Sequence, residues 1–142
     1  MTEEFKNRFQ VFGRDFANAG RVSTAIKEIL KDLGVQAAIV RRIAIASYEA
    51  EMNVVMYAAQ GIINLVVSSE SITIVVDDEG PGIADIELAM QEGYSTATPE
   101  IREMGFGAGM GLPNIKKNAD EFLFTSEVGH GTRLEIRVAL PA

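Results

Sequence analysis

Two polar residues, Glu49 and Asn53, lie within the most apolar helix predicted for this chain, Gln36–Gln60. Residues four apart share one face of a helix and lie about 6 Å apart along its axis. A carboxylate and a carboxamide in such surroundings are costly unless a partner satisfies them. Hydrated Mg²⁺ would do so, because it prefers oxygen ligands and keeps several of its waters. The alternative interpretation is that both residues lie on the solvent face of an amphipathic helix.

A second group of residues has the pattern D-x-G-x-G, formed by Asp78, Gly80 and Gly82 after the predicted β-branched strand Ile72–Val76. A strand can deliver a carboxylate to the floor of a pocket, and glycines let the backbone turn sharply beside a ligand. Such a carboxylate can accept a hydrogen bond from an exocyclic amine such as N6 of adenine. The alternative is a plain acidic turn over Asp77–Gly82.

A third group is a glycine-rich segment in which Gly105, Gly107, Gly109 and Gly111 alternate and run into the predicted helix Leu112–Asn118. Such a segment exposes backbone N–H groups to an anion, and the field of a helix N-terminus favours phosphate. No Gly-Lys-Ser/Thr sequence follows, so the segment is not a P-loop. A flexible linker is the alternative.

Composition limits the chemistry that is available. The chain has 142 residues with 47% hydrophobic and 23% charged, which is typical of one soluble globular domain over 1–142. It has no cysteine, and its one histidine, His130, lies in a predicted hairpin turn, so thiolate and multi-histidine metal sites are excluded. The net charge of -7 argues against nucleic acid. No apolar run is long enough for a membrane helix, and the charged N-terminus lacks a signal-peptide core, so we expect a cytoplasmic protein.

The elements that must position these residues follow from apolar periodicity. The first predicted helix, Asn18–Leu33, has a buried face that includes Leu33. We expect an α/β (α+β) two-layer sandwich, with a mixed, mostly antiparallel sheet covered by helices on one face. The expected order is strand Phe5–Val11, helices Asn18–Leu33 and Gln36–Gln60, strands Ile62–Val67 and Ile72–Val76, helix Asp85–Met90, loop Glu92–Gly109, helix Leu112–Asn118, and strands Phe122–Glu127 and Thr132–Val138. The loop, rich in Gly, Thr and Pro, is expected to be a mobile lid.

In this order and spacing the groups resemble the boxes of the GHKL superfamily of ATPases and kinases, and the resemblance covers nearly the whole chain. Glu49–Asn53 corresponds to the N box, Asp78–Gly82 to the G1 box, Gly107–Leu112 to the G2 box and Gly129–Thr132 to the last glycine-threonine box. The resemblance implies the Bergerat-type ATP-binding fold.

Within that superfamily the chain is similar to the anti-sigma-factor serine kinases, and above all to their stressosome switch-kinase branch (RsbT-like). The residues that carry this likeness are Tyr57–Gly61, Gly93–Thr96 and Gly111–Lys116. It implies an ATP- and Mg²⁺-dependent serine/threonine kinase that phosphorylates a STAS-domain (anti-anti-sigma type) partner. A sigma factor or a phosphatase would be a further partner, and the likeness allows a homodimer.

The resemblance also implies roles for single residues. Glu49 matches the family's general base, Asn53 its Mg²⁺ ligand and Asp78 its adenine-reading carboxylate. Arg21 resembles a partner-contacting arginine, and either Arg102 or Lys116 would meet the charge that develops on the γ-phosphate. The residues expected to bind the nucleotide are Asn53, Asp78, Gly80, Gly82, Gly105, Gly107, Gly109, Gly111, Leu112 and Thr132.

Other functions within the superfamily fit less well. A histidine kinase needs its histidine on a separate dimerisation helix, whereas His130 lies in a hairpin turn. Type II topoisomerases and chaperones of this superfamily carry a further transducer domain. The main rival is a non-catalytic anti-sigma or partner-switch module in which the nucleotide only holds a conformation, and Glu49 favours catalysis because binding alone needs no base.

Overall fold

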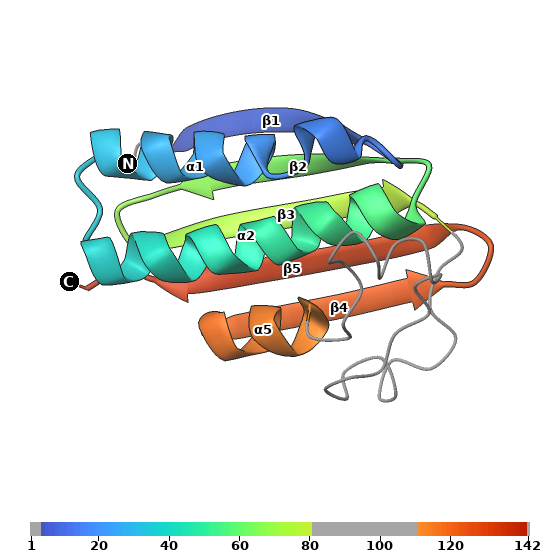
Figure 1. Ribbon diagram of the computed structural model, residues 1–142. Coiled ribbons are helices and arrows are strands. Elements are labelled where there is room, and N and C mark those ends of the chain that lie inside the picture. Colours follow the sequence, from blue (N-terminus) through green and yellow to red (C-terminus); the bar gives the residue numbers. More distant parts are fainter. Residues whose placement is uncertain (1–3, 81–110, 142) are drawn as a thin grey trace.

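A computed structural model describes residues 4–80 and 111–141 of the chain (Figure 1). The predicted helix Asp85–Met90 and the predicted loop Glu92–Gly109 lie outside these residues. The described elements are β1 (Phe5–Phe12), a short 3₁₀ helix (Phe16–Asn18), α1 (Arg21–Asp32), α2 (Ala37–Tyr57), β2 (Gln60–Val67), β3 (Ser71–Glu79), α5 (Gly111–Asn118), β4 (Glu121–Glu127) and β5 (Gly131–Ala139).

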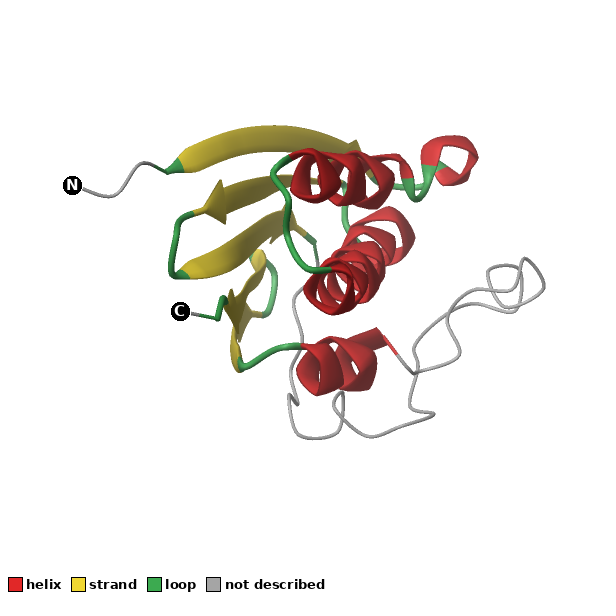
Figure 2. Ribbon diagram, turned by 90° about the vertical axis from the view of Figure 1, so that its left-hand side faces the viewer, coloured by secondary structure: helices red, strands yellow, loops and turns green. Residues whose placement is uncertain are grey.

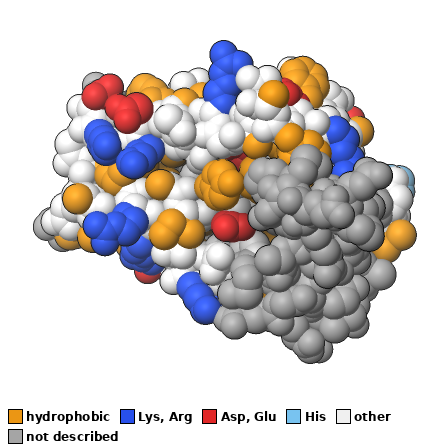
Figure 3. Space-filling model, viewed as in Figure 1, with side chains coloured by type: hydrophobic (Ala, Val, Ile, Leu, Met, Phe, Trp, Pro, Cys, Tyr) orange, Lys and Arg blue, Asp and Glu red, His pale blue; other side chains and the backbone are white. Residues whose placement is uncertain are grey.

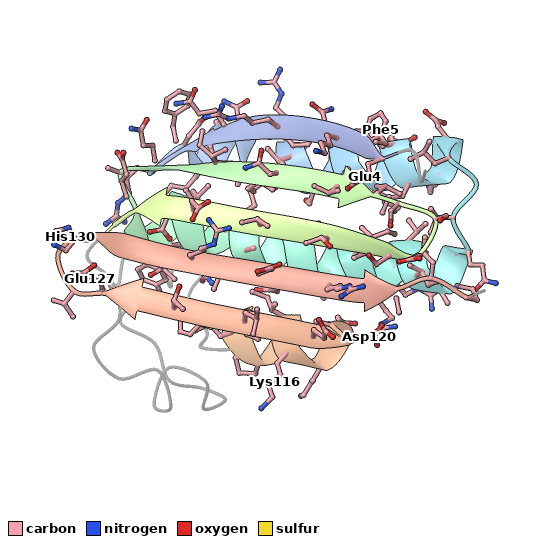
Figure 4. All side chains as sticks on the ribbon, turned by 180° about the vertical axis from the view of Figure 1, so that it is seen from behind. Glu4, Phe5, Lys116, Asp120, Glu127 and His130 are labelled. Atoms are coloured by element: carbon pink, nitrogen blue, oxygen red, sulfur yellow. The ribbon has the colours of Figure 1, made fainter. Side chains whose placement is uncertain are left out.

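The strands form one five-stranded sheet in the order β1-β2-β3-β5-β4, and every described pairing is antiparallel. The described helices cover one face of this sheet (Figure 2), while Figure 4 shows the opposite face without a helix. The expected two-layer α+β sandwich with helices on one face is therefore confirmed. The sheet was expected to be mixed, but no parallel pair occurs among the described strands.

The core lies between the sheet and the helices, with α2 at its centre. Alternate side chains of the inner strands point to the helices, so β2 and β3 alternate between buried and partly buried residues. On α2, apolar residues at helical spacing meet that face. Side chains fully buried between the two layers include Ile43, Ala46, Ala50, Val54, Ile63, Leu65, Ile72, Ile74 and Ile136.

Three boundaries differ from the sequence prediction by three residues, and the others by at most two. Helix α2 ends at Tyr57 and not at Gln60, because Ala58 is extended and Gln60 already pairs with Glu79. Strand β3 continues to Glu79, where a turn was expected after Val76. Its last residues still pair with the backbone of β2 and β5. Helix α1 begins at Arg21, and the preceding turn of chain is 3₁₀.

Leu33 was expected to be buried but is 47% exposed. It lies just beyond the last residue of α1, where the chain turns away from the core. The predicted helix was extended to the last apolar residue of the periodic pattern, which lies one residue beyond the observed end of α1.

A buried carboxyl group joins the two long helices. Glu51 of α2 is 1% exposed. Its side-chain oxygens accept hydrogen bonds from the backbone N–H groups of Gly20 (3.1 Å), Val22 (3.2 Å) and Ser23 (2.9 Å). The N-cap residue of α1, Gly20, has no side chain that could do this, so Glu51 satisfies N–H groups that the first turn of any helix leaves without a partner.

We expect Glu51→Gln to lower the free energy of unfolding by about 2–4 kcal/mol. The NH₂ group of the glutamine would replace one of the accepting oxygens and would face backbone N–H groups of α1, so that donors would meet donors. Urea unfolding followed by circular dichroism measures this. Glu28→Gln is the matched control: its carboxyl is exposed on α1 with Lys31 4.0 Å away, and its effect should stay below about 0.5 kcal/mol. Equal effects of the two substitutions would contradict the capping role.

Candidate functional site

Glu49 and Asn53 meet at the N-terminus of α5. A Cβ built on Gly111 would lie 3.2 Å from Glu49 Oε2 and 3.4 Å from Asn53 Oδ1. Both side chains are partly buried and point to the same place, as their spacing on α2 predicts. A side chain at Gly111 would crowd both of them, which would have to move by a few tenths of an ångström. The helix N-terminus therefore faces a carboxyl and an amide oxygen.

The protonation of Glu49 is set by its surroundings. Burial raises the pKa of its carboxyl above the ordinary value of 4.5, and a hydrogen bond with the Asn114 side chain opposes this rise. A carboxylate with a raised pKa accepts a proton more readily than one in water, and such groups are typical of general bases.

Asp78 lies at the other end of the site, on the helix-facing side of β3. Ile72, Ile74 and Val76 point to the core, and the two-residue alternation places Asp78 on the same face as this row. Its Oδ1 accepts the backbone N–H of Thr132 at 3.0 Å. Burial raises the pKa of this carboxyl, while the Thr132 N–H opposes the rise and the charge of Asp77 adds to it.

The position of Thr132 depends on the backbone of its neighbour. Gly131 has φ +136°, and a Cβ there would overlap the backbone carbonyl oxygen of Asp78. The start of β5 can therefore lie directly against the end of β3. Gly80 lies nearby, and a Cβ built on it would lie 3.2 Å from Asp78 Oδ1 and 3.3 Å from Ala58, which is closer than ordinary contact.

The two ends of the site are joined by α2. Ala58, which follows the last residue of α2, lies beside Gly80, and Glu49 is nine residues earlier, about 13 Å along the helix axis. Asn53 lies between them. The arrangement suits an elongated ligand with a hydrogen-bonding base near Asp78 and anionic groups near the start of α5.

Several predicted residues are not placed. Gly82, Gly105, Gly107, Gly109 and Arg102 lie outside the described residues. Leu112 is buried in the first turn of α5. Lys116 is exposed, and its side chain extends outward from α5 (Figure 4), so the structure does not bring it to Glu49. His130 lies exposed in the β4–β5 turn, as expected (Figure 4).

The donor atoms at Asn53 fit a hydrated cation. Asn53 Oδ1 and the Glu49 carboxyl are hard oxygen donors of the kind that Mg²⁺ prefers. Among the described residues no cluster of three or more His, Cys, Asp or Glu side chains could hold a metal. An ion at Asn53 would therefore take most of its ligands from water and from a bound phosphate.

The sequence analysis missed the role of two residues, one in the site and one beside it. Asn114 contacts Glu49 from a different helix, and no local pattern predicts that contact. Glu51 lies between Glu49 and Asn53 in sequence but points to α1, and only the helical angle of 200° from Glu49 distinguishes it.

No helix in the described part of the chain has the length and apolar character needed to cross a membrane.

The chain is similar to known proteins over most of its length. The family model of the histidine kinase-like ATPase domain matches residues 13–138. The serine/threonine-protein kinase RsbT of Bacillus subtilis is 33% identical over 113 residues, which cover 77% of this chain and 79% of that protein. An anti-sigma F factor of Thermoanaerobacter pseudethanolicus is 34% identical over 116 residues, covering 82% of this chain and 73% of the relative.

The geometry predicts how the carboxyl groups titrate. In carbon-detected NMR, Glu49 should titrate above 4.5 and Asp78 above 3.8. Asn114→Ala should raise the pKa of Glu49 further, because the substitution removes a donor that stabilises the charged form. Asp120, whose pKa is lowered by its hydrogen bonds to Arg42 and the Ala139 N–H, serves as the internal control and should not move. A Glu49 pKa unchanged by Asn114→Ala would contradict this contact.

Proposed function

Because this chain belongs to the family of histidine kinase-like ATPase domains, we propose that it is an ATP- and Mg²⁺-dependent protein serine/threonine kinase. Its substrate is a STAS-domain protein of the anti-anti-sigma type, and the chain acts as an anti-sigma or partner-switch regulator. The observation that carries the proposal is the meeting of Glu49, Asn53 and the start of α5 at one point, 3.2–3.4 Å from the Gly111 Cβ position. The likeness to a serine/threonine kinase and to anti-sigma F factors supports the same role.

Each residue has a distinct task in this mechanism. Asp78 accepts a hydrogen bond from the adenine amine, and the start of α5 receives the phosphates with its free N–H groups. Asn53 would hold the Mg²⁺, which supplies positive charge to the phosphates when bound. Glu49 orients the hydroxyl of the partner's serine or threonine.

In the transfer step one proton moves, one bond to phosphorus forms and one breaks. Glu49 takes the proton of the partner's hydroxyl as its oxygen bonds to the γ-phosphorus. The bond from that phosphorus to the bridging oxygen of ADP breaks, and ADP leaves. Positioning and charge neutralisation account for most of the catalysis, because phosphoryl transfer needs little covalent help.

Asp78→Asn should weaken ATP binding by about 10- to 100-fold, because the adenine amine loses a charged acceptor. Isothermal titration calorimetry with and without Mg²⁺ measures the affinity. Asp77→Asn is the matched control: it is adjacent in β3, but its carboxylate pairs with Arg133 at 2.9 Å on the opposite face. If both variants bind ATP as the wild type does, Asp78 is not in the nucleotide site.

Glu49→Gln should slow phosphoryl transfer by about 10²–10⁴-fold while ATP affinity stays within about twofold, because an amide keeps the size of the side chain but cannot take the proton. In the wild type, transfer should fall as pH drops through the raised pKa of Glu49, since only the charged carboxylate accepts a proton. Wild-type transfer rates in Glu49→Gln would exclude Glu49 as the base.

Asn53→Ala should instead weaken the Mg²⁺-dependent part of ATP binding.

A further inference from the structure

A groove of about 670 Å³ runs along the outer surface of α1 and α2 and reaches Glu49. Its lining combines three basic side chains, Lys27, Lys31 and Arg41, with the apolar Ile45 and Tyr48. We call it the α1–α2 groove. The two helices are antiparallel, because Gly20 before α1 lies beside Tyr48, which is in the C-terminal half of α2. The groove therefore has a basic part near the α1–α2 turn and leads to the carboxyl of Glu49.

The charge of the groove is opposite to that of the molecule. The chain has a net charge of -7, yet the groove has three cations and only Glu49 as an acid. Within residues 4–80 and 111–141, Lys27 and Arg41 form no ion pair, and Lys31 has only Glu28 at 4.0 Å. Figure 3 shows basic and apolar side chains interspersed over the helical layer. Like charges gathered in this way attract an acidic partner.

The apolar part of the groove is accessible. Ile45 and Tyr48 are each 38% exposed, although α2 is otherwise the most buried helix of the described fold. A tyrosine among exposed apolar side chains and a neighbouring arginine is the composition typical of the centre of a protein interface. A free acidic metabolite would use the cations but would gain little from Ile45 and Tyr48, whereas a protein segment would use both.

From these observations we infer that the α1–α2 groove binds an acidic segment of the protein substrate and directs its hydroxyl to Glu49. This inference rests on the proposed function. Arg41 and Glu49 are eight residues apart on α2, about 12 Å along the axis. The substrate should therefore carry a cluster of carboxylates about 12 Å from the serine or threonine that is phosphorylated. Selectivity for the substrate then comes from basic and apolar side chains that lie outside the nucleotide site.

The test compares two double charge reversals. Lys27→Glu with Arg41→Glu alters the groove, and Lys6→Glu with Arg8→Glu alters two exposed cations of β1, whose side chains alternate away from the helix-facing row. Both variants change the net charge by the same amount. With a STAS-domain protein that the wild type phosphorylates, the groove variant should raise KM for that protein roughly tenfold or more, with kcat and ATP affinity within about twofold. The β1 variant should keep the wild-type KM.

Salt and folding controls complete the experiment. Wild-type KM should rise with ionic strength, and that of the groove variant should rise less. Thermal melts of both variants should match the wild type, because all four side chains are exposed. Equal KM values for the two variants would overturn the inference and leave the kinase proposal standing.

The opposite failure is distinguishable. If the wild type binds a STAS-domain protein without phosphorylating it, and the groove variant alone loses that binding in calorimetry, the groove assignment holds and the kinase proposal fails. Wild-type binding of vesicles containing anionic phosphatidylserine, lost in the groove variant while KM for the protein is unchanged, would identify a membrane surface and overturn the inference.

Discussion

Three of the polar side chains of helix α2, those of Glu49, Glu51 and Asn53, lie against the neighbouring helices α1 and α5, where a polar group without a partner is costly. Glu51 takes the first N–H groups of α1. Glu49 takes Asn114 of α5 and, together with Asn53, lies beside Gly111. These contacts fix both neighbouring helices against α2. The same helix thus contacts the first residues of both α1 and α5 and positions the carboxyl that we propose as the base.

The different roles of the Glu51 and Glu49 carboxyl groups follow from their environments. Glu51 is saturated by backbone donors and is not available for chemistry. Glu49 is partly buried, and burial raises its pKa and makes it a better proton acceptor. At the far end of the site, Asp78 accepts the backbone N–H of Thr132, and a carboxylate can accept more than one such bond. The two carboxyl groups that we assign to the site are thus those whose pKa is raised by burial.

Much of this could be predicted from local pattern. The spacing of Glu49 and Asn53 on an apolar helix predicted that the two side chains share one helix face, and this is seen because the signal is periodic and short-range. Asp78 was expected in a turn after the strand, whereas it lies within β3. The ends of α2 and β3 were wrong, since they depend on which neighbouring strand still offers a hydrogen-bonding partner. Glu51 and Asn114 act across 28 or more residues of sequence, and no local pattern encodes such contacts. The glycine-rich segment before Gly111 stays a prediction.

The central claim is that this chain transfers the γ-phosphate of ATP to a hydroxyl of a STAS-domain protein. Incubating the wild-type protein with radiolabelled ATP, Mg²⁺ and a panel of purified STAS-domain proteins tests it most directly. We predict label on one of these proteins, stable to acid and mapped by mass spectrometry to a serine or threonine. Tight binding of a STAS-domain protein with no label on any member of the panel would contradict the claim and indicate a binding module.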